Sequence, residues 1–414
     1  MTDIQKENKS GGKVPNNPKQ IPNLRFPEFE GEWEVKKLGE IATFSKGKGI
    51  SKSEIEENGI TECIRYGELY THYREVINEI KSRTNVDKSA LVLSEENDVI
   101  IPASGETTID IATASCVLKP GIALGGDLNI IKSKNDGVFL SYYLNSKKKM
   151  EIANLAQGIS VVHLYSSQLA SLSLSLPTNQ EQEKISTFLA KISERIDCSI
   201  KILEQLETLI KNVSEKVFSQ NIKFKKIEEK WEVKTLGEIL IEINERTINS
   251  NQYRVLSSTA KGLFYQSDYF NKEVASKDNA GYKILKINQL VFSPQNLWLG
   301  NINVNTTYEI GIVSPSYKVF SFNEKAIVSY CKYFLKSSKM MFEYEQCSEQ
   351  GASIVRRNLN MDLFLNIPIL LPKLEEQIQI SSFLTKIDQK IQTEKAILEQ
   401  LEMQKKYLLQ QMFV

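Results

Sequence analysis

Residues 31–41 read GEWEVKKLGEI, and residues 229–239 read EKWEVKTLGEI. A second pair of matching stretches begins with LPTNQEQEKISTFLAKI at Leu176 and LPKLEEQIQISSFLTKI at Leu371. Weaker similarities lie between these anchors in the same order: ENDVII and INQLVF, LSYYL and VSYCKYFL, QGISVV and QGASIV. Solenoid repeats recur many times at intervals of ~20–50 residues. This unit recurs once, 198 residues later at the tryptophans Trp33 and Trp231. The sequence therefore predicts two homologous domains.

The composition is that of a folded protein: of 414 residues, 41% are hydrophobic and 25% are charged. The net charge of +1 argues against a polycationic protein that coats nucleic acid, although local basic patches are compatible with it. Residues 1–22 are polar and lack the apolar segment of a secretion signal, so we expect a flexible tail. The apolar runs are far shorter than the ~20 residues of a membrane span. We therefore expect a cytoplasmic protein without a membrane partner.

The cysteines and histidines do not form a metal-binding pattern. Five cysteines occur without a CxxC pair, and only two histidines, His72 and His163, accompany them. This pattern argues against a structural zinc site, and no metal ligand is predicted. We interpret the cysteines as reduced thiols, as is usual in the cytoplasm.

A long helix is predicted after each LP…EQ stretch, because apolar residues recur at steps of three or four from Asn179 to about Phe218 and again in the second copy. Lys395 and Lys405 replace two members of the second stripe. Forty helical residues extend roughly 60 Å. We expect the helices to pack antiparallel as a coiled-coil-like spacer; the alternative is two separate helices, each on its own domain. The predicted packing positions are Ile185, Leu189, Ile192, Ile196, Leu203, Leu206, Ile380, Leu384, Ile387, Ile391, Leu398 and Leu401.

The predicted organisation has five segments. They are a polar tail (1–22), a first domain (23–177), a central spacer helix (178–222), a second domain (223–372) and a C-terminal spacer helix (373–414). Both domains mix short β-rich runs such as DVIIPA and YKVFSF with helical stretches, which is typical of α+β folds. Outside the anchors the two domains differ, as expected of related domains that read different targets.

Catalytic motifs are missing from the sequence. It has no GxGxxG after a strand, no GxxxxGK[ST], no HExxH and no Asn/Asp-Pro-Pro-aromatic motif of amino-methyltransferases. GKGISKS at Gly47 lacks the glycine spacing of a phosphate loop, so we interpret it as a polar loop whose lysines can contact backbone phosphates. No catalytic residue is predicted, and a self-sufficient nuclease or methyltransferase is kept only as an alternative. The loop lysines are Lys46, Lys48 and Lys52.

The middle of the first domain contains groups suited to reading nucleic acid. IRYGELYTHYREV combines cations, aromatic rings and an acceptor within residues 64–76, and PASGETTID places polar residues around Gly105. For each residue the alternative is an ordinary surface or turn position, so the clusters weigh more than their members. The candidate DNA contacts here are Arg65, Tyr66, Tyr70, His72, Arg74, Ser104, Glu106 and Thr107, with Ser160 and His163 from GISVVHLY.

The second domain offers a different set. SPQNLWLGN carries amide groups of the kind that pair bidentately with adenine edges, and GASIVRRN places two arginines after a glycine turn. The candidate contacts are Arg246, Arg254, Lys261, Gln295, Asn296, Trp298, Asn301, Arg356 and Arg357.

Taken together, these features resemble the specificity subunit of type I restriction-modification enzymes. The similarity is carried by the two W-x-V-K-x-L-G-E-I openings, the two LP…EQ junctions and the helices that follow them, and it covers nearly the whole chain after the tail. The polar tail is a departure that the family pattern does not need. Lys395 and Lys405 also depart from a uniformly apolar seam, and we expect them to face partner subunits instead.

The resemblance implies two target recognition domains in a pseudo-twofold arrangement, held apart by antiparallel helices, each binding one half of a split double-stranded DNA sequence. It also implies two methyltransferase subunits that bind S-adenosylmethionine and methylate adenine, and restriction subunits that use ATP and Mg²⁺. No cofactor is expected on this chain itself. The alternative from another class is a protein–protein adaptor with two tandem binding domains.

Overall fold

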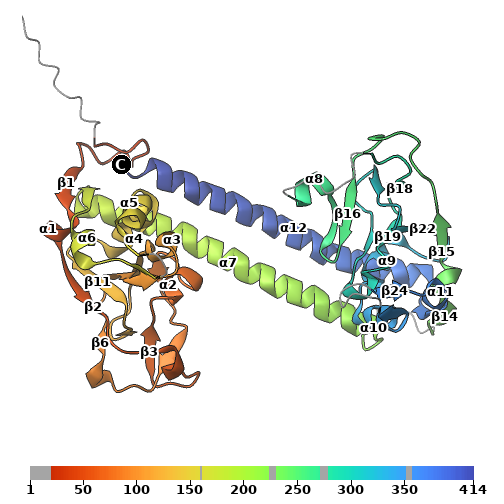
Figure 1. Cartoon of the computed structure of the whole chain (residues 1–414), viewed down its shortest axis with the longest axis horizontal. Helices are drawn as coiled ribbons and strands as arrows, with labels where there is room; N and C mark the ends of the chain where they lie inside the picture. Colours follow the sequence, from red (N-terminus) through yellow and green to blue (C-terminus); the bar gives the residue numbers. More distant parts are fainter. Residues whose placement is uncertain (1–19, 159–160, 223–229, 271–277, 351–356) are drawn as a thin grey trace, which may run out of the picture. The chain divides into compact units, whose positions relative to one another are not determined.

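The computed structural model describes residues 20–158, 161–222, 230–270, 278–350 and 357–414. The chain forms two compact units: unit 1 comprises Met1–Ser199 and Ile397–Val414, and unit 2 comprises Ile200–Ala396. Each unit mixes strands with helices, and two long helices belong partly to each unit: α7 (Asn179–Phe218) and α12 (Leu374–Gln411) (Figure 1). The predicted α+β fold class with long helices is confirmed, and the bounds of α7 coincide with those that the apolar periodicity predicted.

Unit 1 is built on two sheets. The larger has the strand order β2-β11-β7-β9-β4, and the smaller has the order β5-β3-β10-β6. Every residue of β7 is buried, which explains its run of apolar residues without alternation. The strands are β2 (Ala42–Lys46), β11 (Leu128–Ser133), β7 (Asp98–Pro102), β9 (Ser115–Val117), β4 (Val76–Ile77), β5 (Ser82–Thr84), β3 (Thr61–Ile64), β10 (Ala123–Leu124) and β6 (Val92–Leu93).

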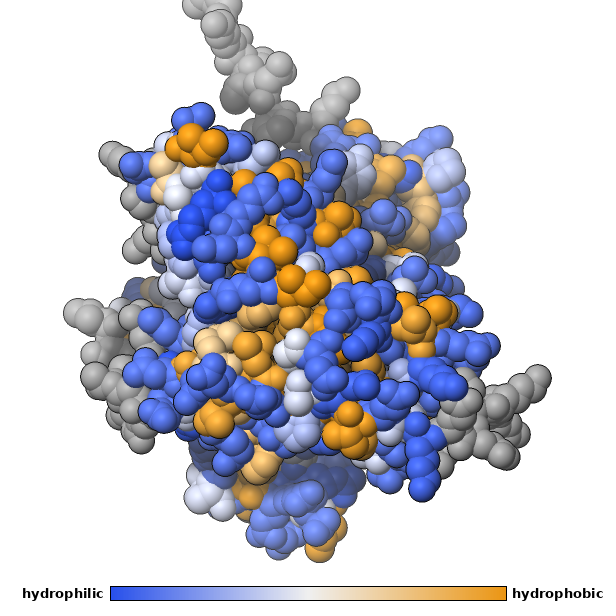
Figure 2. All heavy atoms as spheres, turned by 90° about the vertical axis from the view of Figure 1, so that its right-hand side faces the viewer, coloured by the Kyte–Doolittle hydropathy of each residue, from blue (hydrophilic) through white to orange (hydrophobic). Residues whose placement is uncertain are grey.

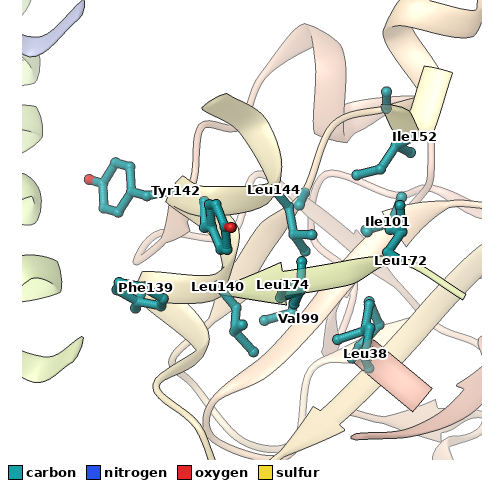
Figure 3. Packing of buried hydrophobic residues seen from close by; sticks show 14 of the residues in the cluster. Leu38, Val99, Ile101, Phe139, Leu140, Tyr142, Leu144, Ile152, Leu172 and Leu174 are labelled. Carbon is teal, nitrogen blue, oxygen red and sulfur yellow. The ribbon is translucent and has the colours of Figure 1, made fainter. Parts of the chain in front are cut away.

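The main core of unit 1 lies between the larger sheet, helix α4 (Gly137–Ser146) and the long helices. Figure 3 shows side chains of α4, among them Leu140 and Leu144, close to Leu174 of β13 (Ser173–Leu176) and Val99 of β7. The residues that follow α12 complete this core, because the Phe413 ring packs on the rings of Trp33, Phe139 and Tyr143. The C-terminal residues are therefore part of the first core, although they come last in the chain.

Unit 2 has a four-stranded sheet with the order β15-β22-β19-β20. Its core packs helix α9 (Val328–Phe334) and helix α10 (Ser338–Gln346) against this sheet, the end of α7 and the start of α12. The face of unit 2 turned to the viewer in Figure 2 is largely hydrophilic, with hydrophobic side chains exposed in smaller areas. The strands are β15 (Leu240–Ile243), β22 (Lys318–Phe322), β19 (Leu290–Phe292) and β20 (Ile302–Val304), with the separate pairs β16 (Leu256–Thr259)–β17 (Gly262–Tyr265) and β18 (Lys283–Lys286)–β21 (Ile310–Val313).

The duplicated sequences form the same structure in both units. Strand β1 (Glu34–Lys37) pairs antiparallel with β13, and β14 (Glu232–Thr235) pairs with β25 (Pro368–Leu371), in the same register: Glu34 opposite Leu176 and Glu232 opposite Leu371. Each opening motif therefore forms a strand beside the LP strand that leads into a long helix.

The tryptophan of each opening motif is bonded to the long helix of its own unit. The Trp33 indole Nε1 donates to Glu181 Oε1 at 3.3 Å, and the Trp231 Nε1 donates to Glu376 Oε2 at 3.0 Å. In unit 1 the Arg25 guanidinium also pairs with Glu181 at 2.7 Å, and this ion pair together with the hydrogen bond raises the pKa of Arg25. The Glu181 carboxylate, which is 1% exposed, therefore has both an arginine and an indole partner where it is buried.

The glutamine of the EQ motif joins three segments. The Gln182 side-chain amide donates to the Pro177 carbonyl at 3.0 Å and accepts from the Asp136 backbone N–H at 3.1 Å. Gln377 does the same with Pro372, at 2.8 Å, and with the Ile327 N–H, also at 2.8 Å. Asp136 and Ile327 immediately precede α4 and α9. Each glutamine therefore links the start of a long helix to the start of the neighbouring domain helix.

The long helices run antiparallel within each unit. In unit 1, Ile185 and Leu189 from the start of α7 share a core with Leu408 near the end of α12 and with Met412 directly after it. In unit 2, Val217 from the end of α7 shares a core with the start of α12. Helices packed only on their own domains would not place the end of α12 in unit 1, so that alternative is wrong. Seven of the twelve predicted packing positions are buried and the other five are half-buried: Ile192, Leu206, Ile387, Leu398 and Leu401.

The two lysines of the second stripe lie in different surroundings. Lys405 is only 8% exposed, and its Nζ pairs with Glu75 Oε2 at 2.8 Å and lies 5.4 Å from the centre of the Tyr142 ring. Lys395 pairs with Glu207 of α7 at 2.8 Å. The expectation that Lys405 faces a partner subunit is therefore wrong, because its charge is neutralised inside unit 1.

We predict that Gln182→Ala lowers the free energy of unfolding by about 2 kcal/mol, because it leaves the Asp136 N–H and the buried Pro177 carbonyl without their partner. The change is measured by urea denaturation followed through tryptophan fluorescence. Gln180→Ala is the matched control, since Gln180 lies on the exposed side of the same helical turn. Equal stability of the two variants would show that the Gln182 bonds do not hold the helix.

Candidate nucleic-acid interface

The first candidate surface begins at the loop after β2. The Gly47 N–H donates to the Leu128 carbonyl at 3.0 Å, and the Lys48 N–H donates to the Leu124 carbonyl at 2.9 Å. A Cβ on Gly47 would lie 2.0 Å from the Gly125 carbonyl oxygen, so only glycine permits this approach. The loop is thereby fixed with Lys46 and Lys48 exposed, and neither lysine has an ion-pair partner among the described residues.

Arg65 lies beside Gly125, the glycine whose carbonyl approaches Gly47. The Gly125 N–H donates to the Ile64 carbonyl at 2.9 Å, and the Arg65 N–H donates to Glu68 Oε2 at 2.8 Å. Glu68 is itself buried and begins the short helix α2 (Glu68–Thr71). Within the described parts of the chain, Arg65 has no carboxylate partner, and its buried Nε has no hydrogen-bond acceptor. The backbone at Arg65 is therefore fixed, and the buried Nε of its guanidinium is an unused donor among the described residues.

Tyr70 lies within electrostatic range of both Arg65 and the segment that contains Glu106. Burial, reinforced by the negative charges of Glu106 and Asp110, raises the pKa of Tyr70, so its hydroxyl stays protonated and can donate. Glu106 is exposed directly after β8 (Ser104–Gly105), which pairs with β12 (Val162–His163). The stretches PASGETTID and GISVVHLY, more than fifty positions apart, are therefore neighbours.

His163 and Tyr165 complete the surface. Their rings are stacked with centres 6.4 Å apart, and Lys46 Nζ lies 6.0 Å from the centre of the Tyr165 ring. We define the unit 1 polar surface as Lys46, Lys48, Arg65, Tyr66, Tyr70, Glu106, His163 and Tyr165. It combines two exposed lysines, the half-buried Arg65, aromatic rings and the exposed Glu106 carboxylate. Tyr165 was not among the predicted contacts, although it follows His163 by two positions.

Other predicted residues of unit 1 lie elsewhere or have structural roles. Lys52 and His72 are exposed outside this set. Ser104 was predicted as an exposed DNA contact, but the structure buries it: the residue is 5% exposed and lies in the β8–β12 pair. Thr107 caps helix α3 (Thr108–Ile111), where its hydroxyl accepts from the Asp110 N–H at 3.1 Å. The Arg74 side chain turns to α7 and pairs with Asp197 at 3.5 Å.

In unit 2, one candidate group surrounds Arg254. Its guanidinium lies 3.4 Å from the centre of the Tyr265 ring and 3.3 Å from Asp268. The Tyr265 and Tyr308 rings are 4.4 Å apart. Neither tyrosine was predicted, although the aromatic run LFYQSDYF was a visible signal. This arrangement fixes an arginine on an aromatic face, with part of its charge offset by Asp268.

A second group in unit 2 pairs Trp298 with Arg357. The Arg357 guanidinium lies 4.2 Å from the centre of the indole and 3.1 Å from Glu345. Its backbone N–H donates to the Gln295 carbonyl at 3.2 Å, just as the Leu164 N–H donates to Ala103 in unit 1. The buried Trp298 Nε1 has no acceptor within the described segments. The two units therefore bring corresponding segments together with different side chains.

The remaining predicted residues of unit 2 are dispersed. Asn301 was predicted as an exposed DNA contact, but it is only 7% exposed, and its amide oxygen accepts from the Ser258 hydroxyl at 2.6 Å. Gln295 is exposed and Asn296 is half-buried. The Arg246 guanidinium donates to the Gly281 carbonyl at 3.0 Å, and Lys261 is exposed after β16. Ser160 and Arg356 lie outside the described residues.

Across the described ranges, no group of three or more His, Cys, Asp or Glu side chains is placed to hold a metal ion. Burial raises the pKa of the Cys63 thiol to about 11, which makes it a poor nucleophile at neutral pH. Of the helices that the structure describes, none is long and apolar enough to cross a membrane.

The chain is similar to proteins of one family. The family model described as "Type I restriction modification DNA specificity domain" matches twice, at residues 30–208 and 228–403. A type I restriction enzyme MjaVIII specificity subunit from Methanocaldococcus jannaschii is 25% identical over 425 aligned positions, covering 94% of this chain and 93% of the relative. The EcoR124I/EcoR124II specificity subunit from Escherichia coli is 27% identical over 208 positions, covering 46% of this chain and 45% of the relative.

Solved structures share the fold. The crystal structure of the S subunit of a type I restriction-modification system from M. genitalium has a TM-score of 0.63 at 16% identity, covering 95% of this chain and 99% of that one. The two matches to the family model begin just before the two tryptophans and end within the two long helices. The duplicated junctions, the long helices and these matches agree. The chain belongs to the family of type I restriction-modification DNA specificity subunits.

Proposed function

We propose that this chain reads a two-part double-stranded DNA target, with one part contacted by each unit, as the recognition subunit of a type I restriction-modification complex. The observation that carries the proposal is the unit 1 polar surface. Four separate segments contribute to it, and Lys46, Lys48 and Arg65 are cations without carboxylate partners in the described chain. Unpaired cations beside aromatic rings and polar groups are suited to contact DNA phosphates and bases.

The side chains suit direct reading of bases. An arginine with free donors pairs with the O6 and N7 acceptors of guanine, a glutamate accepts from the cytosine amino group, and tyrosine and histidine rings contact bases and sugars. Arg65 and Glu106 supply these functions in unit 1. Trp298, Arg357 and Arg254 supply a different set in unit 2. Different sets in equivalent places predict two unlike half-sites.

We further propose that α7 and α12 set the gap between the half-sites. Their lengths, 40 and 38 residues, correspond to about 60 Å and 57 Å of helix. Two protein contacts in the major groove on one face of DNA are separated by about one helical turn, roughly 34–36 Å. Helices of this length suffice for such a separation.

The chain has no proposed catalytic role. Two methyltransferase subunits would bind S-adenosylmethionine and methylate adenine, and restriction subunits would use ATP and Mg²⁺ to translocate and cut. This chain would serve as their scaffold. A protein–protein adaptor is the rival function, and a purified complex that keeps its partners but ignores DNA sequence would favour it.

We predict that Arg65→Ala relaxes the sequence preference in one half-site, because the free donors of the guanidinium are lost. The preferred base should lose about 1–3 kcal/mol of discrimination. Sequencing of methylated adenines in cells that carry the variant measures the change. Arg83→Ala is the control, since Arg83 is exposed and pairs with Glu62 at 3.2 Å. An unchanged target in Arg65→Ala would remove Arg65 from the reading residues.

We predict that seven residues inserted in α7 between Glu204 and Glu207, with seven more in α12 after Lys395, lengthen the gap and leave both half-sites intact. Seven helical residues add about 10.5 Å, or roughly three base pairs. The paired insertion preserves the local match of Lys395 with Glu207. A methylated target whose gap is unaltered would contradict the role of the helices as a spacer.

We predict that exchanging residues 25–177 for those of a related subunit alters only one half-site, because each unit has its own core and its own polar surface. The methylated target is read by sequencing as before. Simultaneous change of both half-sites would contradict independent reading by the two units.

A further inference from the structure

Unit 2 contains a groove where its globular part meets the long helices. The groove encloses a cavity of about 650 Å³. It is bordered by α7, α12, the end of α9, the β16–β17 hairpin and the loop after β20. Four lysines line it, one or two from each of three elements: Lys211, Lys261, Lys332 and Lys336. The Trp298–Arg357 pair described above does not line this groove.

The acidic residues of the groove are already engaged. Asp388 pairs with Lys332 at 2.6 Å. Glu215 accepts from the backbone N–H of Ser338 at 3.0 Å and from its hydroxyl at 2.6 Å. Lys211, Lys261 and Lys336 have no ion pair among the residues that the structure describes, so the groove has an excess of positive charge.

Lys336 is held toward the cavity. Its Nζ donates to Asn303 Oδ1 at 2.7 Å, and Asn303 is itself fixed through its amide nitrogen by Ser258. The Lys336 residue as a whole is exposed, but its amino group is positioned by a neutral acceptor rather than by a carboxylate. An ammonium has three donors. The remaining donors of Lys336 are therefore available to an anion.

Unit 1 has cations at the corresponding place. Tyr142 of α4 bonds Ser193 of α7 at 2.8 Å, and Tyr333 of α9 bonds Asp388 of α12 at 3.2 Å, so these contacts mark equivalent positions. Cavities of about 420 and 300 Å³ lie beside the unit 1 contact. Glu75 is paired with Lys405. Arg74 pairs with Asp197, so the lining lysines without an ion pair among the described residues are Lys147, Lys149 and Lys406, and the larger cavity is also lined by Glu402.

We propose that the lysine groove of unit 2 binds backbone phosphates of the DNA on the gap side of its half-site, and that the basic cavities of unit 1 do the same. This inference rests on the proposed function and adds a second kind of contact to it. Lysine ammonium groups are point charges that bind phosphates without selecting bases. The grooves therefore contribute affinity and position, whereas the reading residues contribute sequence preference.

Protonation of Lys336 supports this assignment. Burial, with the charge of Lys332, lowers the pKa of Lys336 to about 8. Solvent reaching this exposed residue screens part of the effect. A bound phosphate favours the charged amine and raises its pKa, so binding should weaken as the pH rises through 8. The charged groups that face Lys336 are Lys332 from α9, Asp388 from α12, Lys211 and Glu215 from α7, and Lys261 from the hairpin, with the Tyr333 phenol also beside it.

The test uses the full chain in complex with its methyltransferase partner. Lys261→Gln/Lys336→Gln is compared with Lys325→Gln/Lys386→Gln, a control of equal charge outside the groove. Binding to a target duplex and to an unrelated duplex is measured by fluorescence anisotropy between 50 and 300 mM salt. Each lost phosphate contact should reduce the slope of log K against log salt by about 0.9. We expect the groove variant to lose about 1–2 in slope on both duplexes and to methylate the same target.

Three results would overturn the proposal. They are an unchanged slope, an altered methylation target, and loss of the methyltransferase subunit with DNA binding otherwise intact, which would make the groove a protein-docking site. Failure of the wild-type complex to distinguish target from unrelated DNA would instead overturn the proposed function. Lys336→Arg adds a separate readout, since it should retain the salt slope and lose the weakening of binding between pH 7 and 9.

Discussion

The buried glutamine at the start of each long helix is the contact on which the rest of the structure depends. Gln182 and Gln377 are at most 1% exposed, and each side chain bonds the proline carbonyl before the helix and the backbone before the neighbouring helix. A buried amide must make such bonds or lose free energy, so its geometry is strongly constrained. Because a helix rises 1.5 Å per residue, a small change of angle at its start displaces its far end by many ångströms. The same junction occurs in both copies because each unit must direct a long helix.

The duplication separates scaffold from recognition. The Trp–Glu bond, the strand pair and the glutamine junction are repeated with the same register in both units. The segments that follow β7 and β19 are joined to equivalent partners, yet His163 lies opposite Ser104 in unit 1 and Arg357 packs on Trp298 in unit 2. The backbone contacts that position these segments do not depend on the side chains that project from them. Two copies can therefore keep one architecture and present different chemistry.

Charge is organised locally, which the net charge of +1 conceals. Many carboxylates are used in ion pairs or caps, as Glu75, Glu181 and Asp388 illustrate. Lys46, Lys48 and Lys336 have no such partners within the described chain, and they lie on two different surfaces. A DNA-binding chain that also carries other subunits benefits from this arrangement, because attraction is confined to chosen surfaces. Under the proposed function, the unit 1 polar surface would contact base edges and the lysine groove would contact backbone phosphates.

The amino-acid sequence by itself determined the duplication, the mixed α+β class and the bounds of α7, because repeated motifs and a 3.6-residue apolar period are local signals. Only the tertiary structure decided which polar residues share a surface. Ser104 and Asn301 were expected to be exposed turn residues, but both are buried. Ser104 lies in a strand pair formed by distant segments, and Asn301 accepts a hydrogen bond from Ser258. Arg74 and Lys261 were predicted among the base-reading residues, but they line the cavities beside the long helices. Lys405 pairs with Glu75, which is 330 positions away in the sequence. Burial and charge pairing depend on contacts between distant segments, and these exist only after the chain has folded.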